Sequence, residues 1–570
     1  MTAADAQYHW KFADYDVKCA DALTGDSGIS PLLAHLLSMR GVKTSDGVRD
    51  FLNPSLSQLS SPFELDDMRV AVDRIAQAKE KDEAVLVFGD YDVDGIAAAA
   101  ILTRGLRRFG IRQVGHDMPD RFGEGYGLTP ARVEQAKNEK YTLLITVDNG
   151  VSAHDAADRA RELGIDLIVT DHHTIEGILP HAVAVINPKR GPSDHFAAFI
   201  SGAGVAFKLA LALNGSPNDL DLVALGTVSD IVPLLRENRV LVALGLKHIK
   251  THKRLGIDKL AKVSRFNLDE IDSHKIGFQL GPRLNAAGRL DTGHAALNLL
   301  MLENEEENAA LAAELATALD IANEERRAIE RDIFDQAVES LDAFITEEQR
   351  SIVLAREGWH QGVIGIVASR IQNKYYRPVI VFSMGDDGCW HGSARSGPDF
   401  NMMEALNACG DLLVRYGGHA AAAGMTLVSE HLDSFREHFE REALRQLGAG
   451  KLQPTMNVDA IVAFSQLDSA FVRSLEQLEP YGQANLEPVF CAVGVDIVPQ
   501  SSRILKEQHV KFAARQGGIQ LNIIAFRMAE RFCKESLPEK VDIVFTPQLN
   551  TYNNNTEVQL VLKDLRLAEG

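Results

Sequence analysis

The stretch VLVFGDYDVDGIAAAA, from Val85 to Ala100, places three aspartates on alternate positions directly after a short apolar run. The run is too short for a helix, is rich in β-branched residues and is followed by turn-forming residues, so it predicts a strand. Three similar runs, YTLLITVDNG, IDLIVTDHH and AVAVINP, alternate with helical patterns up to about residue 239. This alternation predicts an α/β domain in which helices cover both faces of a parallel sheet.

Acidic side chains follow several of these predicted strands. The strand-end residues are Asp90 after the first run, Asp148 after LLITV, Asp171, His172 and His173 after DLIVT, and Asp230 after the apolar run LVALGTVS. Because the carboxyl ends of parallel strands meet at one edge of an open sheet, we expect these side chains to converge. Converging carboxylates repel one another unless a divalent cation neutralises them. One imidazole among oxygen donors suits Mn²⁺ or Mg²⁺, so the sequence predicts a metal site at this edge.

Other interpretations of the same residues are weaker. The Asp-x-Asp-x-Asp-Gly string fits the start of a calcium-binding EF-hand loop, but its twelfth position, which requires glutamate, is Ile101, and a strand precedes it instead of a helix. A single aspartate at a strand end is usually a helix cap, and a lone histidine is usually structural. Four such ends in one domain, one of them with two adjacent histidines, favour metal binding for the set.

Composition sets the class of protein. With 570 residues and 45% hydrophobic content, the chain is long enough for three or four packed units. No apolar run approaches the ~20 residues of a membrane helix, and the N-terminal residues do not resemble a signal peptide, so we expect a cytoplasmic protein without membrane contact. The five cysteines include no CxxC pair, which argues against a thiolate zinc site.

The formal charge of −20 argues against nucleic-acid binding only when it is averaged over the chain. Residues 301–350 hold 15 acidic side chains against 4 arginines, so about half of the excess lies in one helical segment. Basic residues remain elsewhere, for example Lys189 with Arg190, and Arg283 with Arg289. The net charge therefore does not exclude a nucleic-acid substrate.

The pattern along the chain divides it into five segments. Residues 1–82 predict a helical lead-in, residues 83–250 the α/β domain with the acidic strand ends, and residues 251–349 a long helical connector. Residues 350–448 predict a second α/β domain, which the linker sequence GAGKLQP follows. Residues 455–570 alternate strand patterns with turns such as TYNNNT, which predicts a small β-barrel.

Several motifs together resemble a known family. GDYDVDG, VDNG, DHH and ALGTVSDIVPL resemble the four motifs of DHH-family phosphoesterases. PDRFGEGYGL, GAGVAFKLA, GPRLNAAGRL, GSARS and GGHAAAAG resemble the single-strand-specific 5′ to 3′ DNA exonucleases within that family. The resemblance covers nearly the whole chain. It implies a parallel-sheet DHH domain, a long helical connector, a second α/β domain of the DHHA1 type and a C-terminal OB-type barrel that binds nucleic acid.

The resemblance also implies roles for individual residues. The implied ligands of two Mn²⁺ or Mg²⁺ ions are Asp90, Asp92, Asp148, His172 and Asp230, with Asp148 as the bridge. Asp94, Asp171 and His173 would lie behind the ligands or face the substrate, and His173 is counted with Asp148, His172 and His419 among the catalytic residues. The implied substrate-binding residues are Arg121, Arg283, Ser393, Arg395, Gly417, Gly418 and His419, of which Ser393 and Arg395 would bind the 5′-terminal phosphate. Ala97 departs from the family pattern, because many relatives carry a hydroxyl residue there.

The implied function is hydrolysis of single-stranded DNA from its 5′ end to 5′-mononucleotides, in DNA recombination and repair. The implied partners are single-strand-binding protein and a RecQ-type helicase, with a monomeric enzyme located at the nucleoid. Among the barrel residues, Phe512 and Tyr552 are candidates for stacking on bases, although we favour core packing for both.

Three alternative functions predict other residues or other segments than this chain has. A family-II pyrophosphatase would carry an upstream histidine where this chain has Val87, Phe88 and Gly89. A DHH/DHHA1 phosphodiesterase of short oligonucleotides would lack the connector and the barrel. A non-catalytic scaffold that binds single-stranded DNA would lack several of the aspartates.

Overall fold

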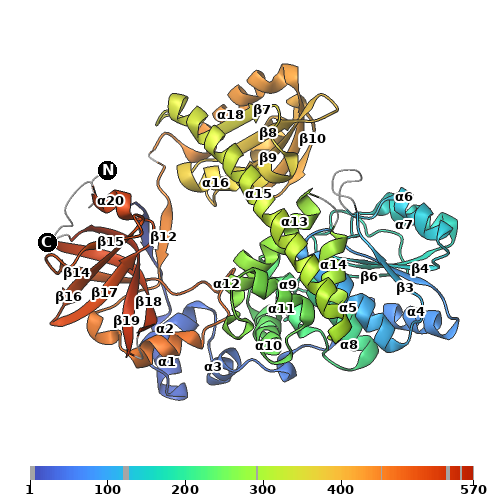
Figure 1. Ribbon diagram of the computed structural model, residues 1–570, viewed down its shortest axis with the longest axis horizontal. Coiled ribbons are helices and arrows are strands. Elements are labelled where there is room, and N and C mark those ends of the chain that lie inside the picture. The colour runs from blue at the N-terminus through green and yellow to red at the C-terminus, as the bar shows by residue number, and fades with distance from the viewer. Residues whose placement is uncertain are drawn as a thin grey trace. The chain divides into compact units, whose positions relative to one another are not determined.

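The structure is a computed structural model that describes residues 7–119, 127–290, 293–450, 452–533, 539–552 and 555–568 (Figure 1). The chain divides into two compact units. The first comprises residues 1–288, 292–317 and 455–570, and the second comprises residues 289–291 and 318–454. The division into five segments stays a prediction, since these two units group the segments differently without testing their boundaries.

A five-stranded parallel sheet forms the centre of the first unit, in the order β3-β2-β4-β5-β6. Its strands are β2 (Val85–Phe88), β3 (Val114–Asp117), β4 (Leu143–Val147), β5 (Asp166–Thr170) and β6 (Ala184–Ile186). The four runs quoted above form β2, β4, β5 and β6, so the predicted parallel sheet is confirmed. The sequence patterns missed β3, an edge strand whose residues are only partly buried.

Helices cover both faces of this sheet. On one face, α6 (Pro130–Asn138) and α7 (His154–Leu163) pack against Leu86, Phe88 and Leu144 in one hydrophobic cluster. On the other face, α5 (Val93–Phe109) and α8 (Gly202–Asn214) contact the sheet and each other. A Cβ atom at Gly105 of α5 would lie 2.8 Å from the Ala210 Cβ atom of α8, so a glycine is needed for this close packing. The helices that carry the acidic motifs are therefore held rigidly against the strand ends.

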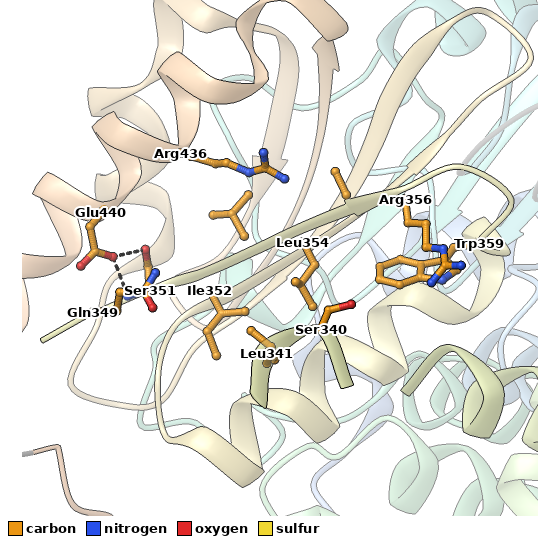
Figure 2. A pocket seen from close by; sticks show the side chains of 12 residues that line it. Ser340, Leu341, Gln349, Ser351, Ile352, Leu354, Arg356, Trp359, Arg436 and Glu440 are labelled. Atoms are coloured by element: carbon orange, nitrogen blue, oxygen red, sulfur yellow. Dashed lines mark hydrogen bonds between the residues drawn. The ribbon is translucent and has the colours of Figure 1, made fainter. Parts of the chain in front are cut away.

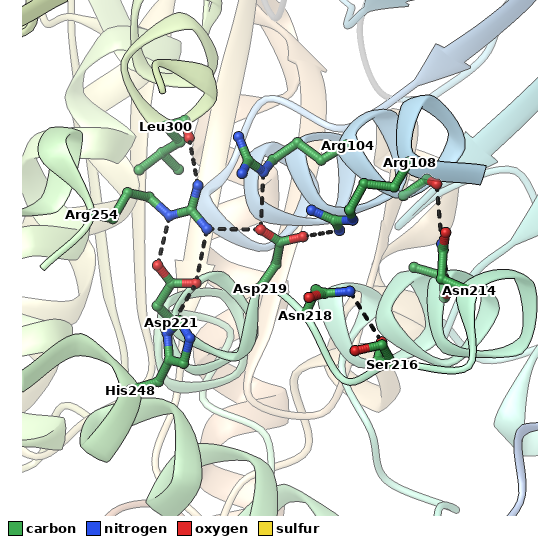
Figure 3. Close-up of polar contacts among 12 residues, drawn as sticks. Arg104, Arg108, Asn214, Ser216, Asn218, Asp219, Asp221, His248, Arg254 and Leu300 are labelled. Atoms are coloured by element: carbon green, nitrogen blue, oxygen red, sulfur yellow. Dashed lines mark hydrogen bonds and ion pairs between the residues drawn. The ribbon is translucent and has the colours of Figure 1, made fainter. Parts of the chain in front are cut away.

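A further group of helices packs beside α5 and α8. These are α9 (Leu220–Ser229), α10 (Arg236–His252), α11 (Leu255–Val263), α12 (Ser273–Lys275), α13 (Gly281–Leu290) and α14 (His294–Met301), with a π-helical turn at Ile276–Leu280. Asp219, at the start of α9, holds them to α5 through ion pairs (Figure 3). Its carboxylate lies 2.9 Å from Arg104 Nε and 2.8 Å from Arg254 Nη2, and it also pairs with Arg108. These cations keep the pKa of Asp219 low although burial opposes this.

The C-terminal residues form a barrel. Its elements are β12 (Thr455–Val458), β13 (Ala460–Ile461), α19 (Ser469–Glu476), β14 (Phe490–Ile497), β15 (Arg503–Leu505), β16 (His509–Gln516), β17 (Ile519–Ala525), α20 (Ala529–Cys533), β18 (Lys540–Tyr552) and β19 (Asn555–Leu567). The strands pair in the order β14-β18-β19-β17-β16, and a β14–β16 pairing of two residue pairs joins the two ends. This closed order, with β17 parallel to β19, confirms the predicted OB-type barrel.

The N-terminal segment packs on the barrel. Its strand β1 (His9–Phe12) pairs with β12, and residues of α1 (Val17–Ser27), α2 (Pro31–Met39) and α3 (Ser45–Leu52) share a hydrophobic cluster with the barrel interior. Helix α4 (Met68–Glu80) contacts the parallel sheet at β6, and Arg74 of this helix pairs with Asp166 of β5 at 2.6 Å. The lead-in therefore completes the core of a barrel that lies more than 400 residues away in sequence.

The second unit is built on another five-stranded sheet, in the order β10-β11-β9-β8-β7. Its elements are β7 (Ile352–Arg356), α16 (Gln361–Tyr375), β8 (Val379–Met384), β9 (Cys389–Arg395), α17 (Met402–Ala408), β10 (Leu413–Gly418), β11 (Ala422–Val428) and α18 (Leu432–Leu447). Helix α15 (Ala309–Phe344) begins in the first unit and ends in the second. It packs with α16 on one face of the sheet, and α17 and α18 cover the other face. This arrangement confirms the predicted helical connector and second α/β domain. None of the described helices has the length and apolarity to cross a bilayer.

Candidate metal centre

Three aspartates enter the site between β2 and α5. Asp92 is the N-cap of α5, and its carboxylate accepts a hydrogen bond from the Gly95 amide at 3.0 Å. Asp94, in the first turn, accepts hydrogen bonds from the Gly202 and Ala203 amides at 2.6 and 3.0 Å, at the start of α8. Asp90 is buried beside Gly95, where a Cβ atom would lie 2.5 Å from the Asp90 nitrogen. Asp92 therefore accepts a hydrogen bond within its own helix, whereas Asp94 accepts hydrogen bonds from the start of α8.

Asp148 follows β4 in a strained backbone conformation. Its φ angle is 62°, which a non-glycine residue rarely adopts. The next residue, Asn149, donates hydrogen bonds to the carbonyls of Phe88 and Val147, at 3.3 and 2.9 Å, and ties the ends of β2 and β4 together. A Cβ atom at Gly202 would lie 2.4 Å from Asp148 Oδ1, so only glycine leaves room for this carboxylate.

The Asp-His-His sequence follows β5. The Asp171 carboxylate accepts hydrogen bonds from the Val151 amide at 2.9 Å, the His172 amide at 2.7 Å and His173 Nδ1 at 2.7 Å. Burial alone would lower the pKa of His173, but the hydrogen bond to Asp171 and the negative charges of Asp171, Asp90 and Asp92 together outweigh it, so the pKa lies above its ordinary value. Asp171 therefore shapes the loop and orients His173.

Asp230 does not follow a strand, and this part of the interpretation was wrong. It caps the C-terminus of helix α9, and Leu220 to Thr227 are all buried. A helix buried on all sides is apolar throughout, so its sequence cannot be distinguished from that of a buried strand by periodicity. The Asp230 side chain nevertheless reaches the same place, because its Oδ2 atom lies 3.6 Å from His172 Nε2.

The side chains converge on His172. Its Nε2 atom lies 3.0 Å from Asp148 Oδ1 and 3.8 Å from Asp94 Oδ2. Three overlapping clusters have ligand atoms within 4.8 Å of one another: Asp90, Asp92 and Asp148; Asp148, His172 and His173; Asp94, His172 and Asp230. The predicted convergence of acidic side chains from separate chain segments is therefore what the structure shows.

Among the described residues, Lys189 offsets part of the charge of Asp230, but the carboxylates still repel one another. Burial, followed by repulsion from Asp92, raises the pKa of Asp94 from 3.8 to about 7. Burial and the neighbouring aspartates raise the pKa of Asp230 to about 9 and that of Asp148 well above its ordinary value. Burial and the adjacent His173 lower the pKa of His172 to about 3, so His172 is neutral at pH 7.

These residues fit divalent metal ions. The buried Nε2 atom of the neutral His172 makes no hydrogen bond to any described residue, as expected of a ligand atom. The other donors are carboxylate oxygens, and the clusters found in the described ranges contain no cysteine. Oxygen donors with one or two imidazoles suit Mn²⁺ or Mg²⁺. Asp148 belongs to two clusters, and the two oxygens of its carboxylate would allow it to contact two adjacent ions.

The predicted phosphate-binding residues lie on the second unit. Ser393 and Arg395 are on β9, and Arg395 Nη1 donates a hydrogen bond to Ser393 Oγ at 3.1 Å. A Cβ atom at Gly365 of α16 would lie 2.9 Å from Ser393 Oγ, so this glycine leaves both side chains room. His419 is exposed in the turn between β10 and β11, directly after Gly417 and Gly418.

The remaining predicted residues have different outcomes. Arg283 is partly buried on α13 and donates a hydrogen bond to the Gln279 carbonyl at 2.7 Å, whereas Arg121 lies outside the described residues. Phe512 is 1% exposed in the barrel core, which excludes it from stacking on bases and confirms core packing. The side chain of Tyr552 lies outside what the structure describes. Ala97 is fully buried in α5.

Three further residues lie near the site, and the sequence patterns indicated one of them, Asp94. Asp94 lies in one of the clusters, although it was placed behind the ligands. Asn285 of α13 accepts a hydrogen bond from the Val93 amide at 3.0 Å and holds α13 to the acidic motif. Lys189 was noted only for its charge, but it is close enough to Asp230 to oppose the rise in the pKa of that carboxyl. Only Asp94, from its alternate spacing with Asp90 and Asp92, could have been found from the sequence.

Comparisons with known proteins agree with this geometry. Three family models match: the DHH family N-terminal domain at residues 84–227, the DHHA1 domain at 348–444 and the RecJ OB domain at 458–564. The chain is 36% identical to the single-stranded-DNA-specific exonuclease RecJ of Bacillus subtilis, covering 99% of this chain and 71% of that protein. It is 33% identical to the RecJ of Escherichia coli, covering 94% and 96%.

Solved structures show the same similarity. The crystal structure of RecJ in complex with Mn²⁺ from Thermus thermophilus superposes with a TM-score of 0.84 at 30% identity, covering 99% of this chain and 80% of that one. The Mg²⁺ complex of the same protein superposes with a TM-score of 0.78 at 28% identity, covering 99% and 79%.

Proposed function

Because this chain belongs to the RecJ family of single-stranded-DNA-specific exonucleases, we propose that it removes 5′-mononucleotides from the 5′ end of single-stranded DNA. It is a metal-dependent nuclease with Mn²⁺ or Mg²⁺ as cofactor. The observation that carries the proposal is the convergence of buried and partly buried carboxylates from three chain segments on the neutral His172. The match covers 96% of the Escherichia coli relative, and this favours a DNA substrate over the short-oligonucleotide and scaffold alternatives.

The ligands that we assign are Asp90, Asp92, Asp148, His172 and Asp230. Asp148 would be the ligand shared by two ions, because it lies in two of the three clusters and its carboxylate has two oxygens. Asp94 supports the ligands by holding the start of α8 beside them. Divalent ions bound in this way supply an activated water near neutral pH and neutralise charge on the phosphate in the transition state.

Two histidines have roles that follow from their surroundings. His172 stays neutral, so its Nε2 lone pair is available as a ligand at physiological pH. His173 is bonded to Asp171 through Nδ1 and has a raised pKa, so it can hold a proton near neutral pH and place it against a phosphate oxygen. His419 belongs to the second unit and contacts the substrate backbone in our assignment.

The direction of digestion follows from recognition of the 5′ phosphate. Arg395 offers a planar guanidinium and Ser393 a hydroxyl on the same strand, which is the chemistry that binds a terminal phosphate dianion. Arg121, Arg283, Gly417 and Gly418 contact the following nucleotides in this assignment. The barrel binds the rest of the single-stranded DNA in this assignment.

The partners and the cellular location are also part of the proposal. We assign single-strand-binding protein and a RecQ-type helicase as partners that provide the unpaired strand in recombination and repair. The enzyme then works as a monomer in the cytoplasm at the nucleoid. The family resemblance is the support for each of these statements.

The test compares single-stranded DNA with blunt duplex DNA, each labelled at one end, with and without a 5′ phosphate. In Mn²⁺ we expect release of mononucleotides from the 5′ end of the single strand only, and no product in EDTA. Degradation of blunt duplex at an equal rate would refute the single-strand assignment. Release from the 3′ end would refute the direction, and cleavage of only short oligonucleotides would favour the phosphodiesterase alternative.

A further inference from the structure

Strand β7 forms an open edge of the sheet in the second unit. It pairs with β8 on one side, and no strand of the described residues pairs with its other side. The Ile352 amide donates to the Pro378 carbonyl at 2.9 Å, so Ile352, Leu354 and Arg356 direct their backbone groups toward β8. In a parallel pair the residues between them direct theirs away. The N–H and C=O groups of Val353 and Ala355 therefore face the open edge.

A cavity of about 490 Å³ follows this edge (Figure 2). On one side it is lined by Ser340 and Leu341 of α15 together with Trp359. On the other side it is lined by Arg436 and Glu440 of α18, and the residues of β7 form its floor. The cavity thus offers a row of backbone groups between two walls of side chains.

One end of the edge is already satisfied. Glu440 accepts hydrogen bonds from the Ser351 amide at 2.8 Å and from the Ser351 hydroxyl at 2.5 Å. The Ser351 amide is the first that faces the open edge, and Glu440 accepts its hydrogen bond. The next two amides that face the open edge belong to Val353 and Ala355. Edge strands are normally protected by proline, by inward charges or by a covering segment, because their free backbone groups attract other strands. The sequence IVLAR of β7 has no such protection before its last residue.

The open part of the cavity is cationic. Arg436 points over the middle of the strand and Arg356 lies at its end (Figure 2). Arg436 pairs with Asp433 at 3.0 Å, but the Asp433 side chain is 92% exposed, and such surface pairs are weak. An acidic side chain in the cavity would therefore find Arg436 available, whereas a basic one would be repelled.

We propose that the β7 edge is the docking site for an extended acidic peptide of a partner protein, which adds to the sheet as a further strand. Successive side chains of an added strand point to opposite faces. One set contacts Leu341 and Trp359 and is apolar, and the other contacts Arg436 and is acidic. The occupant is thus a segment in which apolar and acidic residues alternate, and this site is separate from the proposed nuclease chemistry.

The experiment measures binding of a fluorescent eight-residue peptide of alternating leucine and aspartate to the full-length protein, by anisotropy. Ala355→Pro removes an outward amide and should be tolerated, since proline is found where an edge-strand amide faces away from the sheet. Arg436→Glu reverses the charge in the cavity. Arg441→Glu makes the same charge change at an exposed position of α18 outside the cavity and is the matched control. Exonuclease activity reports that each variant is folded.

We expect Ala355→Pro to abolish binding, Arg436→Glu to weaken it by about tenfold or more, and Arg441→Glu to change it less than about twofold. Two peptides N-methylated on alternate amides provide a test that leaves the protein unchanged, and only one of them should bind. Equal binding by Ala355→Pro or by both methylated peptides would overturn the added-strand geometry. Equal binding of a leucine-lysine peptide would overturn the acidic class. Absence of peptide binding would overturn the proposal and indicate an unoccupied edge. Self-association of the protein that Ala355→Pro abolishes would overturn it and indicate that the edges of two copies pair with each other.

Discussion

Replacement of Gly202 by alanine tests the packing that positions Asp148. A Cβ atom at residue 202 would lie 2.4 Å from Asp148 Oδ1 and 2.5 Å from Asp148 Cβ, whereas ordinary contact begins at 3.4 Å. The Asp148 side chain must therefore move by roughly 1 Å, since the first turn of α8 is held by its hydrogen bonds to Asp94. The mutation adds one methyl group and removes no functional atom.

A displacement of about 1 Å in a catalytic group costs on the order of 100-fold in rate. We therefore expect Gly202→Ala to lower kcat/KM by about 100-fold, or roughly 2.7 kcal/mol. The affinity for Mn²⁺ should fall by about 10-fold to 100-fold, because Asp148 is the ligand shared between clusters. Calorimetric titration with Mn²⁺ and digestion of 5′-labelled single-stranded DNA measure the two quantities.

The control is Gly191→Ala, where the nearest atom to the added Cβ is the Pro188 carbonyl oxygen at 3.7 Å and φ is −84°. This variant should match the wild type in both assays. Both variants should keep the wild-type melting temperature within a few degrees, which separates an effect on the site from unfolding. Wild-type Mn²⁺ affinity and kcat/KM in Gly202→Ala would refute the steric reasoning.

Four further predictions follow from the same contacts. Asp148→Asn should lower kcat/KM by about a thousandfold, roughly 4 kcal/mol, while the circular dichroism spectrum is kept; near-normal turnover in Mn²⁺ would contradict its role as a ligand. Because the pKa of Asp230 is raised from 3.8 to about 9, the folded metal-free protein keeps a proton that the unfolded chain loses, so its stability should fall as the pH rises between these values. Urea unfolding in EDTA at pH 5 and 8 measures this fall, which Asp230→Asn should reduce and Mn²⁺ should offset; a rise with pH would show the sign to be wrong. Asp219→Asn should destabilise the protein by about 1 to 3 kcal/mol, because Arg104, Arg108 and Arg254 lose a charged partner while Arg254 keeps its ion pair with Asp221, and an unchanged free energy of unfolding in urea would count against the network. Arg395→Ala should reduce the preference for 5′-phosphorylated over 5′-hydroxyl ends by about 10-fold to 100-fold, and an unchanged ratio would remove Arg395 from phosphate binding.

Part of the site could be predicted because its signals are local. The strands β2, β4 and β5 are short, β-branched and bounded by turn residues, and their final residues follow from that pattern. The carboxyl ends of parallel strands lie at one edge of the sheet. The convergence of Asp90, Asp148 and His172 could therefore be predicted without the rest of the structure. Mn²⁺ or Mg²⁺ could be predicted because these metals prefer oxygen donors with one imidazole, and the residue types alone show which donors are present.

Other parts depended on contacts between distant segments. An apolar run has the same composition in a strand and in a helix buried on all sides, so the helical α9 and the entry of Asp230 from its end could not be read from periodicity. Asp94 joins the site because two amides of α8, more than 100 residues away, bind its carboxylate.

The sequence by itself determined the strands β2, β4, β5 and β6, the strand-rich C-terminal segment and the acidic ends of β2, β4 and β5, because side-chain period and turn residues act over a few neighbouring positions. Only the tertiary structure decided that β1 pairs with β12, that β14 pairs with β16 to join the ends of the barrel, and that β7 keeps an open edge. Backbone amides and carbonyls are alike in every residue except proline, which has no N–H group. Which of them pair across hundreds of positions is therefore set by how the whole chain packs.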